Sequence, residues 1–409
     1  MPLLTHIGVL STPRAGAPQG TLESIPDACL VWRADRIAWV GPRHALPAHF
    51  DDEAPIDARG RLVVPGLVDC HTHLAFGGWR ADEFDRRLRG ESYLDIARTG
   101  GGILRTVAQT RAASFDSLLE SSREKAHEML SLGVTTLECK SGYGLDVPTE
   151  LRLLEVYATL ARVGPQRIVP TFLGAHTVPA EHRAAPGAFL DVVCHEMLPA
   201  IAERGLARFC DVFVEDGAFT PADARRLMAM AQRYGLRPKL HVDQLHDGGG
   251  AALAAELEAI SADHLEHVSA HGIERLAEAG VVAVSLPIAS LYLQQPPMPA
   301  RPLLEAGVPV AVATDFNPGT APSGHLPLAM TLACTTQRMT PGEVLAGATL
   351  VAARAIGLEG EIGSLEPGKR ADFALIDAPD VGHWLYRFRG NACTDAYIGG
   401  ACAWRAPAA

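Results

Sequence analysis

Between residues 62 and 356 the chain alternates short apolar runs with stretches of helical pattern, and this alternation constrains the fold more than any other feature. Such alternation is typical of β-α-β units, whose strands form a parallel sheet. Eight runs are predicted to be strands: Leu62–Cys70, Val134–Cys139, Ile168–Ala175, Phe209–Glu215, Pro238–Asp243, Ala259–Leu265, Val281–Leu286 and Val308–Asp315. Eight strands over roughly 300 residues favour a closed (β/α)8 barrel of the TIM type over an open sheet.

The two ends of the chain have a different pattern. Residues 30–40 alternate around Ala34-Asp35 as a hairpin does, and Gly399-Gly400 near the C-terminus is a two-residue hairpin signal. We therefore predict an α/β protein with a small β-sandwich domain built from both termini, residues 1–61 and 357–409, and a barrel domain over residues 62–356. Residues 77–114 form an insertion before the second strand, and Gly100 to Gly102 within it are a candidate lid hinge.

Charge and hydropathy exclude several classes of partner. The 409 residues carry a formal net charge of −11 with no run of Lys or Arg, which argues against a nucleic-acid or anionic-membrane surface. No segment reaches the ~18 apolar residues of a membrane span. Pro13, Arg14 and Pro18 interrupt the stretch where a signal peptide would be apolar, so we expect a cytoplasmic protein. The eight cysteines lack C-x-x-C spacing, which favours buried free thiols over disulfides or a cysteine zinc site.

Polar side chains follow the predicted strands at the end where a TIM-type barrel carries its active site. The first strand ends at His71 and His73, which are two residues apart and so project to one face. Later strands end in further residues with reactive or ligating side chains: Lys140, Tyr143, His176, His241, Gln244, His264, Asp315 and Asn317. Because the strand ends of one barrel converge, we expect these side chains to surround one site.

Four of these residues form a set suited to a metal ion, namely His71, His73, His241 and Asp315. A single strand-end histidine is more often a core or surface residue than a ligand. Three imidazoles and one carboxylate together favour zinc or another divalent transition metal, with a position left for water. Such a metal lowers the pKa of its bound water to about 7, so hydrolysis is the expected chemistry.

Several short motifs are spread from the first predicted strand to the last. Pro-Gly-Leu-Val-Asp-Cys-His-Thr-His at residues 65–73, His241, Asp315 and the late Gly-Ser-Leu-Glu-Pro-Gly-Lys-Arg-Ala-Asp at residues 363–372 together resemble the amidohydrolase superfamily. More narrowly, the chain is similar to the imidazolonepropionase family at residues 76–80, 100–103, 140–144, 173–176, 241–244, 261–264 and 314–319. The resemblance covers nearly the whole predicted barrel.

This resemblance implies that a small molecule, 4-imidazolone-5-propanoate, is hydrolysed to N-formimidoyl-L-glutamate in L-histidine degradation. Water attacks the ring carbonyl, the bond from the carbonyl carbon to nitrogen breaks, and the carbonyl carbon becomes a carboxylate. The resemblance further implies a homodimer and contacts from Asn317, Gly319 and Thr320 to the product.

In that reaction Asp315 is expected to bind the metal and to carry the water proton to the leaving nitrogen, with a purely ligating role as the alternative. His264 is expected on the opposite side of the carbonyl, as a hydrogen-bond donor or an acid. Gln244 has no titratable proton in range and is predicted to hydrogen-bond the ring.

The propionate tail needs a cation in a chain that is negative overall. Arg80 is the leading candidate, because a guanidinium holds a carboxylate through two parallel hydrogen bonds and because this position matches the family pattern. Tyr143, in a glycine-flanked loop, and His176, after the third strand, are the further predicted contacts to substrate.

One metal ion per subunit is expected, Zn²⁺ or Fe (2+ or 3+). Many amidohydrolases hold two metals bridged by a carboxylated lysine of strand 4, whereas strand 4 here ends Val214-Glu215-Asp216. Lys140 follows strand 2 and is predicted to lie in a loop or behind the ligands, and His267 to be structural.

Two other functions are compatible with parts of this pattern. A purine or pyrimidine deaminase would use the same metal set, but it would not require Arg80 and Tyr143 for a flexible carboxylate. A catalytically silent scaffold would have no need for an unpaired carboxylate facing three imidazoles.

Overall fold

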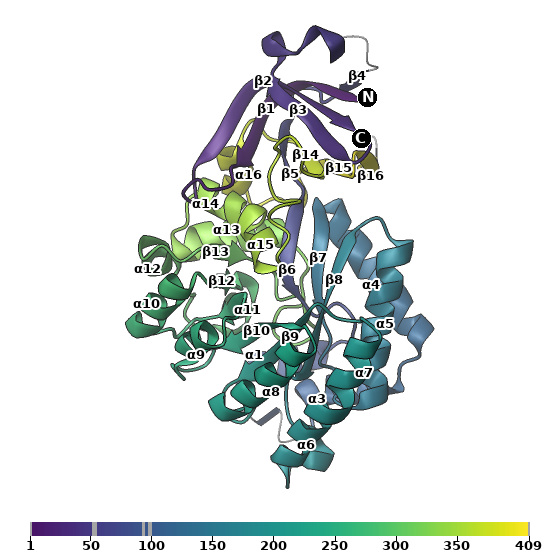
Figure 1. Ribbon diagram of the computed structural model, residues 1–409, viewed down its shortest axis with the longest axis vertical. Helices are drawn as coiled ribbons and strands as arrows, with labels where there is room; N and C mark the ends of the chain where they lie inside the picture. Colours follow the sequence, from purple (N-terminus) through teal and green to yellow (C-terminus); the bar gives the residue numbers. More distant parts are fainter. Residues whose placement is uncertain (1, 51–54, 92–94, 97–99, 408–409) are drawn as a thin grey trace.

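The computed structural model describes residues 2–50, 55–91, 95–96 and 100–407, and its strands form two eight-stranded sheets (Figure 1). One sheet is parallel throughout and takes its strands in chain order: β6 (Leu67–Thr72), β7 (Val134–Lys140), β8 (Arg167–Ala175), β9 (Phe209–Val214), β10 (Arg237–Val242), β11 (Ser261–His264), β12 (Val282–Ser285) and β13 (Val310–Val312). Strands that pair in sequence order with helical connections form a (β/α)8 barrel. The predicted barrel is confirmed.

Backbone contacts bring the first and last strands of the barrel together. Thr72 bridges Phe316 in parallel register, and the amide of His73 donates to the Phe316 carbonyl at 2.8 Å. The amide of Asp315 donates to the carbonyl of His71 at 3.1 Å. The residues at these ends of β6 and β13 are therefore held next to each other by the closure of the barrel itself.

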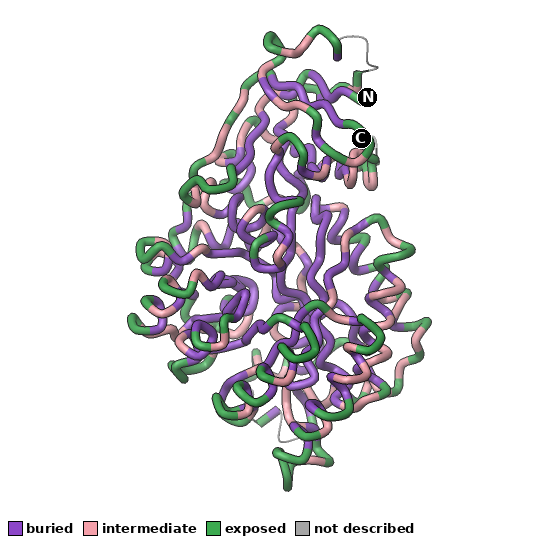
Figure 2. Tube along the Cα trace, in the orientation of Figure 1, coloured by how far each residue is buried: buried purple, intermediate pink, exposed green. Residues whose placement is uncertain are grey.

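Helices surround the barrel, and Figure 2 shows buried central strands inside a more exposed outer layer. Pro221 opens one of them, and Thr220 and Asp223 form a reciprocal capping box that satisfies its first amides. The helices are α1 (Ala81–Leu88), α3 (Ile103–Ala112), α4 (Phe115–Ser131), α5 (Val147–Val163), α6 (Pro186–Val192), α7 (Leu198–Glu203), α8 (Pro221–Arg233), α9 (Gly250–Glu256), α10 (Ala270–Ala279), α11 (Pro287–Leu293), α12 (Ala300–Glu305), α13 (Leu326–Gln337), α14 (Pro341–Gly347), α15 (Leu350–Ala355) and α16 (Val381–Tyr386). The π-helical turn Val193–Met197 joins α6 to α7.

The second sheet is mixed and lies at one end of the molecule, beyond the barrel (Figure 1). Its path runs β16-β15-β14-β5-β1-β2-β3, with β4 paired to β1. The strands are β1 (Leu3–Pro13), β2 (Leu22–Arg33), β3 (Arg36–Pro42), β4 (Pro55–Asp57), β5 (Leu62–Pro65), β14 (Phe373–Ile376), β15 (Cys393–Ile398) and β16 (Ala401–Arg405). Both ends of the chain thus contribute to one small β domain, and the predicted hairpins at Ala34-Asp35 and Gly399-Gly400 join β2 to β3 and β15 to β16.

This second sheet folds over onto itself. The ring of Trp32 on β2 lies 5.4 Å from that of Phe373 on β14 and 6.2 Å from that of Tyr397 on β15. Since β5 and β1 separate β14 from β2 along the sheet, the two halves must face each other across a shared apolar core. This is the sandwich arrangement that the strand-rich termini predict.

The single strand predicted over residues 62–70 is wrong. The structure divides it into β5, which pairs with β1 and β14 in the terminal sheet, and β6, which begins the barrel. Gly66 lies between them, and a Cβ there would come within 2.4 Å of the Thr135 hydroxyl. The apolar run is continuous because both halves are buried, so hydrophobicity alone does not mark where the chain passes from one sheet to the other. The predicted domain boundaries stay a prediction.

Three further expectations concern the rest of the chain. All eight cysteines are free thiols, and all but Cys334 and Cys402 are buried, as predicted. Among the described residues no helix has the length and apolar character needed to cross a bilayer. In the insertion, Gly100 and Gly102 have positive φ angles, and the amide of Gly102 donates to Glu83 at 2.9 Å; a hinge function there stays a prediction.

Candidate active site

A cavity of about 1320 Å³ opens at the carboxyl ends of the barrel strands. It is lined by most of the predicted site residues: His73, Arg80, Tyr143, His176, His241, Gln244, His264, Asp315, Asn317 and Thr320. Of the remaining predicted residues, His71 is fully buried beside His73 and Gly319 lies against Arg80. The sequence-predicted residues therefore converge on one place, as the barrel topology requires.

The first group in this cavity consists of two histidines and an aspartate from opposite ends of the barrel sequence. His71 is in β6, His73 follows it, and Asp315 follows β13. The Nε2 atoms of His71 and His73 lie 3.4 Å and 3.5 Å from the same carboxylate oxygen, Oδ1 of Asp315. Burial alone would raise the pKa of Asp315, but the contacts with the two imidazoles outweigh it and hold the pKa well below its usual range.

Two buried carboxylates, those of Asp263 and Asp211, orient the imidazole rings of His71 and His241 from the side away from the cavity. Nδ1 of His71 donates to Oδ2 of Asp263 at 2.7 Å, and Nδ1 of His241 donates to Oδ1 of Asp211 at 3.1 Å. In both rings the Nε2 atom is buried and has no hydrogen-bond partner among the residues that the structure describes. A carboxylate on one imidazole nitrogen fixes the tautomer and leaves the lone pair of the other nitrogen free, as in histidines that bind metals.

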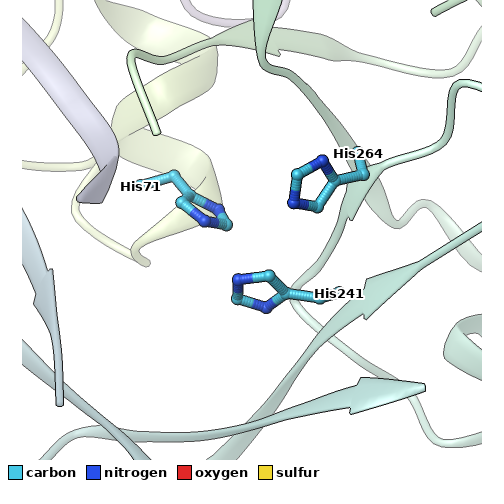
Figure 3. A group of neighbouring side chains, drawn as sticks. All are labelled: His71, His241 and His264. Atoms are coloured by element: carbon cyan, nitrogen blue, oxygen red, sulfur yellow. The ribbon is translucent and has the colours of Figure 1, made fainter. Parts of the chain in front are cut away.

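These orphaned nitrogen atoms fit a metal ion. The ligand atoms of His71, His241 and His264 lie within 4.8 Å of one another, and so do those of His71, His73 and Asp315. Figure 3 shows His71, His241 and His264, with their three rings directed toward one another. Burial lowers the pKa of His71 and lowers that of His241 to about 3, so both imidazoles are neutral and can donate a lone pair.

The predicted quartet is thus spread over two overlapping groups that share His71. His264, predicted as a donor or acid, is an additional ligand candidate by this geometry.

The sequence profile of the amidohydrolase family matches residues 62–402, which include the whole barrel. This chain belongs to the amidohydrolase family.

Curated relatives of this chain include several imidazolonepropionases. The chain is 51% identical over 358 residues to an imidazolonepropionase of Cereibacter sphaeroides, covering 87% of this chain and 89% of that protein. It is 48% identical over 377 residues to an imidazolonepropionase of Symbiobacterium thermophilum, covering 91% and 88%. An imidazolonepropionase of Shouchella clausii is 44% identical over 393 residues, covering 95% and 88%.

Solved structures of a deaminase and a chlorohydrolase share the fold at low identity. A 5-methylcytosine deaminase from Klebsiella pneumoniae superposes with a TM-score of 0.75 at 16% identity, covering 100% of this chain and 99% of that one. An atrazine chlorohydrolase from Arthrobacter aurescens TC1, complexed with zinc, gives 0.75 at 18% identity and covers 98% and 95%. At such identities the likeness shows the fold alone.

Arg80 brings a cation into the amidohydrolase cavity. The side chain is buried, and within the described part of the chain its Nε and Nη1 atoms have no hydrogen-bond partner. The nearest carboxylate, that of Glu83, lies 3.8 Å from Nε. A buried guanidinium without hydrogen bonds is costly, so its exposure to the cavity indicates a place for an anionic group.

Tyr143 and His176 form one aromatic wall of the cavity. Their rings lie 5.4 Å apart, and the ring of His176 stacks on that of His73 at 5.2 Å. Nδ1 of His176 donates to the carbonyl of Gly142 at 3.0 Å. Burial, reinforced by His73 and His241, lowers the pKa of His176 well below its ordinary value, so this ring is neutral.

The turn after Asp315 is built by Asn317. Its Oδ1 atom accepts from the amides of Gly319 and Thr320, both at 2.8 Å, and its Nδ2 atom donates to the Asp315 carbonyl at 2.7 Å. The Asn317 side chain therefore shapes the turn that carries Gly319 and Thr320 to the cavity. Contacts of these three residues to a product stay a prediction.

His264 faces the cavity from the end of β11 in a left-handed backbone conformation, with φ of +83°. Burial alone would lower its pKa, but Glu266 raises it, with Nδ1 of His264 lying 3.6 Å from Oε2 of Glu266. Ser290 in turn donates to Oε1 of Glu266 at 2.8 Å. Among the described residues, the cavity lining does not include His267.

Apart from Lys140, the charged residues behind the ligands were not identified from the sequence. Lys140 ends β7 rather than lying in a loop, and with Glu138, Asp211, Lys239 and Asp263 it is fully buried. The available signal was a charged residue inside an otherwise apolar strand, since such residues are seldom buried without a partner. Glu138 and Lys140 pair within β7, but the other partners come from different strands and could not be assigned from spacing.

Proposed function

We propose that this chain hydrolyses 4-imidazolone-5-propanoate to N-formimidoyl-L-glutamate, the ring-opening step in L-histidine degradation. The observation that carries the proposal is one cavity that holds both the His/Asp cluster and the buried guanidinium of Arg80, whose Nε and Nη1 atoms have no hydrogen-bond partner among the described residues. The relatives named imidazolonepropionase, 43–51% identical over most of the chain, support the same reaction.

His71, His73, His241 and Asp315 would hold one metal ion, which when bound activates water and polarises the ring carbonyl. Asp315 accepts the proton of the attacking water and delivers it to the ring nitrogen as the bond from that nitrogen to the carbonyl carbon breaks. Its carboxylate suits this exchange because the two neighbouring imidazoles keep it ionised before the attack.

His264 donates a hydrogen bond to the carbonyl oxygen as negative charge develops there. Glu266 and Ser290 keep its ring in place from behind. His264 lies at the end of β11, which β12 separates from β13 in the barrel order, so the donor approaches from a different strand than Asp315.

Arg80 holds the propionate carboxylate, and the ring lies against the wall made by Tyr143 and His176. Gln244, which also lines the cavity, hydrogen-bonds the ring nitrogens through its amide. Asn317, Gly319 and Thr320 contact the product at the turn that positions Arg80.

The metal is Zn²⁺ or Fe, one per subunit, because strand β9 supplies no lysine that could bridge a second ion. We further propose that the protein is a cytoplasmic homodimer. Metal analysis by mass spectrometry and the molar mass in solution by light scattering test these two statements.

The reaction is tested by incubating the purified protein with imidazolone propionate, with and without added Zn²⁺ or Fe²⁺, and following loss of the imidazolone ring. Turnover that a chelator abolishes and metal restores supports the proposal. Guanine and 5-methylcytosine serve as alternative substrates. Deamination of either at a higher kcat/KM than imidazolone hydrolysis contradicts the proposal, as does absence of turnover in the metal-loaded protein.

A further inference from the structure

A layer of buried charge lies directly behind the candidate metal ligands. It contains two lysines and three carboxylates, all completely inaccessible to solvent: Glu138, Lys140, Asp211, Lys239 and Asp263. These five side chains project from four barrel strands, β7, β9, β10 and β11. A buried ion is costly unless it is closely paired, so the contacts of each of these side chains indicate its role.

Lys140 is the member that touches the others most closely. Its Nζ lies 2.9 Å from Oε1 of Glu138, 2.8 Å from Oδ2 of Asp211 and 3.5 Å from Oδ2 of Asp263. Burial alone would lower the pKa of Lys140, but the three carboxylates raise it, so the ammonium form is present.

The same two aspartates hold the ligand histidines. Oδ1 of Asp211 accepts from His241 while its Oδ2 accepts from Lys140. In Asp263, Oδ2 accepts from His71 and also faces Lys140. One ammonium group therefore links the two carboxylates that set the ring orientations of two ligand candidates on different strands.

We propose that Lys140 is a positioning residue of the metal centre: by joining Asp211 to Asp263 it fixes the relative placement of the His71 and His241 Nε2 atoms. The proposal rests on the proposed function only in requiring that these histidines bind metal. Lys140 is outside the described cavity lining and does not act on substrate.

Positioning and simple electrostatics predict opposite effects of removing this lysine. An ammonium group near the site repels a metal cation, so on charge alone its loss would tighten metal binding. If Lys140 positions the ligands, its loss weakens binding instead. The two aspartates would repel each other without the ammonium group between them, and the rings that they hold would turn.

The test is the affinity of purified Lys140→Met protein for Zn²⁺, measured by competition with a chromophoric chelator. We expect a loss of about 10- to 100-fold, the usual effect of removing a group that supports metal ligands. The visible absorption bands of the Co²⁺-loaded protein should also shift, because they report ligand geometry directly.

Two matched variants separate positioning from general stability of the buried layer. Lys239→Met removes the other lysine, whose Nζ is 3.9 Å from Asp263 and which makes no described contact with Asp211. Glu138→Gln removes a carboxylate that contacts Lys140 and Thr171 but, among the described contacts, none of the ligand histidines. Both should keep the wild-type affinity and Co²⁺ spectrum, although each should lower the melting temperature.

Zinc affinity in Lys140→Met equal to or tighter than wild type would overturn the proposal, and so would equal losses in all three variants. If Lys140→Met does not fold, the double variant Glu138→Gln/Lys140→Met, which removes one charge of each sign, takes its place with the same expected loss. Failure of the metal site itself is recognised separately, because His71→Ala would then bind zinc as tightly as wild type.

Discussion

Gly319 lies directly against the guanidinium of Arg80: a Cβ on Gly319 would be 1.1 Å from Nη2 of Arg80. That distance is far inside van der Waals contact, so the two positions cannot both keep their places if residue 319 has a side chain. The glycine leaves room for the cation at the cavity wall. The turn after β13 and the residue before α1 are therefore structurally coupled.

Gly319→Ala should therefore behave as a substrate-binding variant. We expect KM for imidazolone propionate to rise at least tenfold, with a smaller change in kcat, because Arg80 is displaced while the His/Asp cluster is untouched. Steady-state kinetics measures both. Gly324→Ala is the control, since its Cβ would meet only the flexible Met129 side chain. An unchanged KM in Gly319→Ala would show that Arg80 does not bind the propionate.

Arg80→Ala should raise KM directly. A desolvated ion pair to a carboxylate that loses one partner typically costs about 2–5 kcal/mol, so kcat/KM should fall by a factor of 30 or more. Arg105→Ala is the matched control, because Arg105 also approaches Glu83, at 3.9 Å, but lies outside the described cavity lining. Equal kinetics for the two variants would contradict the assigned role.

Asp315→Asn should abolish turnover through kcat. The amide cannot accept the water proton, and loss of a general base typically costs about 10²- to 10⁴-fold in rate. Asp216→Asn removes an exposed carboxylate from the cavity wall and should leave kcat within a factor of two. Metal content should be measured in parallel: full activity of the Asn variant at normal metal content would remove the proton role from Asp315.

The pH dependence of stability should contain a contribution from Lys125, on the inner face of α4. Burial lowers its pKa from 10.5 to about 7, and Glu124 opposes this. Between these values the unfolded chain binds a proton that the folded chain does not, so this contribution makes the folded state more stable as pH rises through that window.

Relative to Lys125→Met, the unfolding free energy of the wild type should therefore gain roughly 1–2 kcal/mol between pH 7 and pH 9. Urea denaturation at several pH values measures it. Arg123→Met changes an exposed residue of the same helix and should run parallel to the wild type. A Lys125→Met profile that also runs parallel would mean that Lys125 stays protonated, held by the Leu74 carbonyl at 3.2 Å and the Phe76 ring at 3.4 Å.

Much of the architecture was predictable because it depends on local patterns. The alternation of apolar runs with helical stretches is a property of neighbouring residues, and it led to the barrel and to the strand-end positions of His71, His241 and Asp315. The split at Gly66 was not predictable in the same way. Both β5 and β6 are fully buried, so hydropathy does not change where the chain moves from one sheet to the other.

By itself, then, the sequence determined the fold class, the family and the residues that converge at the strand ends. Only the tertiary structure decided how those residues are held. The carboxylate on His71 belongs to Asp263, 192 residues away, and the atom that crowds position 319 belongs to Arg80. Such contacts join separate strands and loops, and their distances exist only once the barrel has closed.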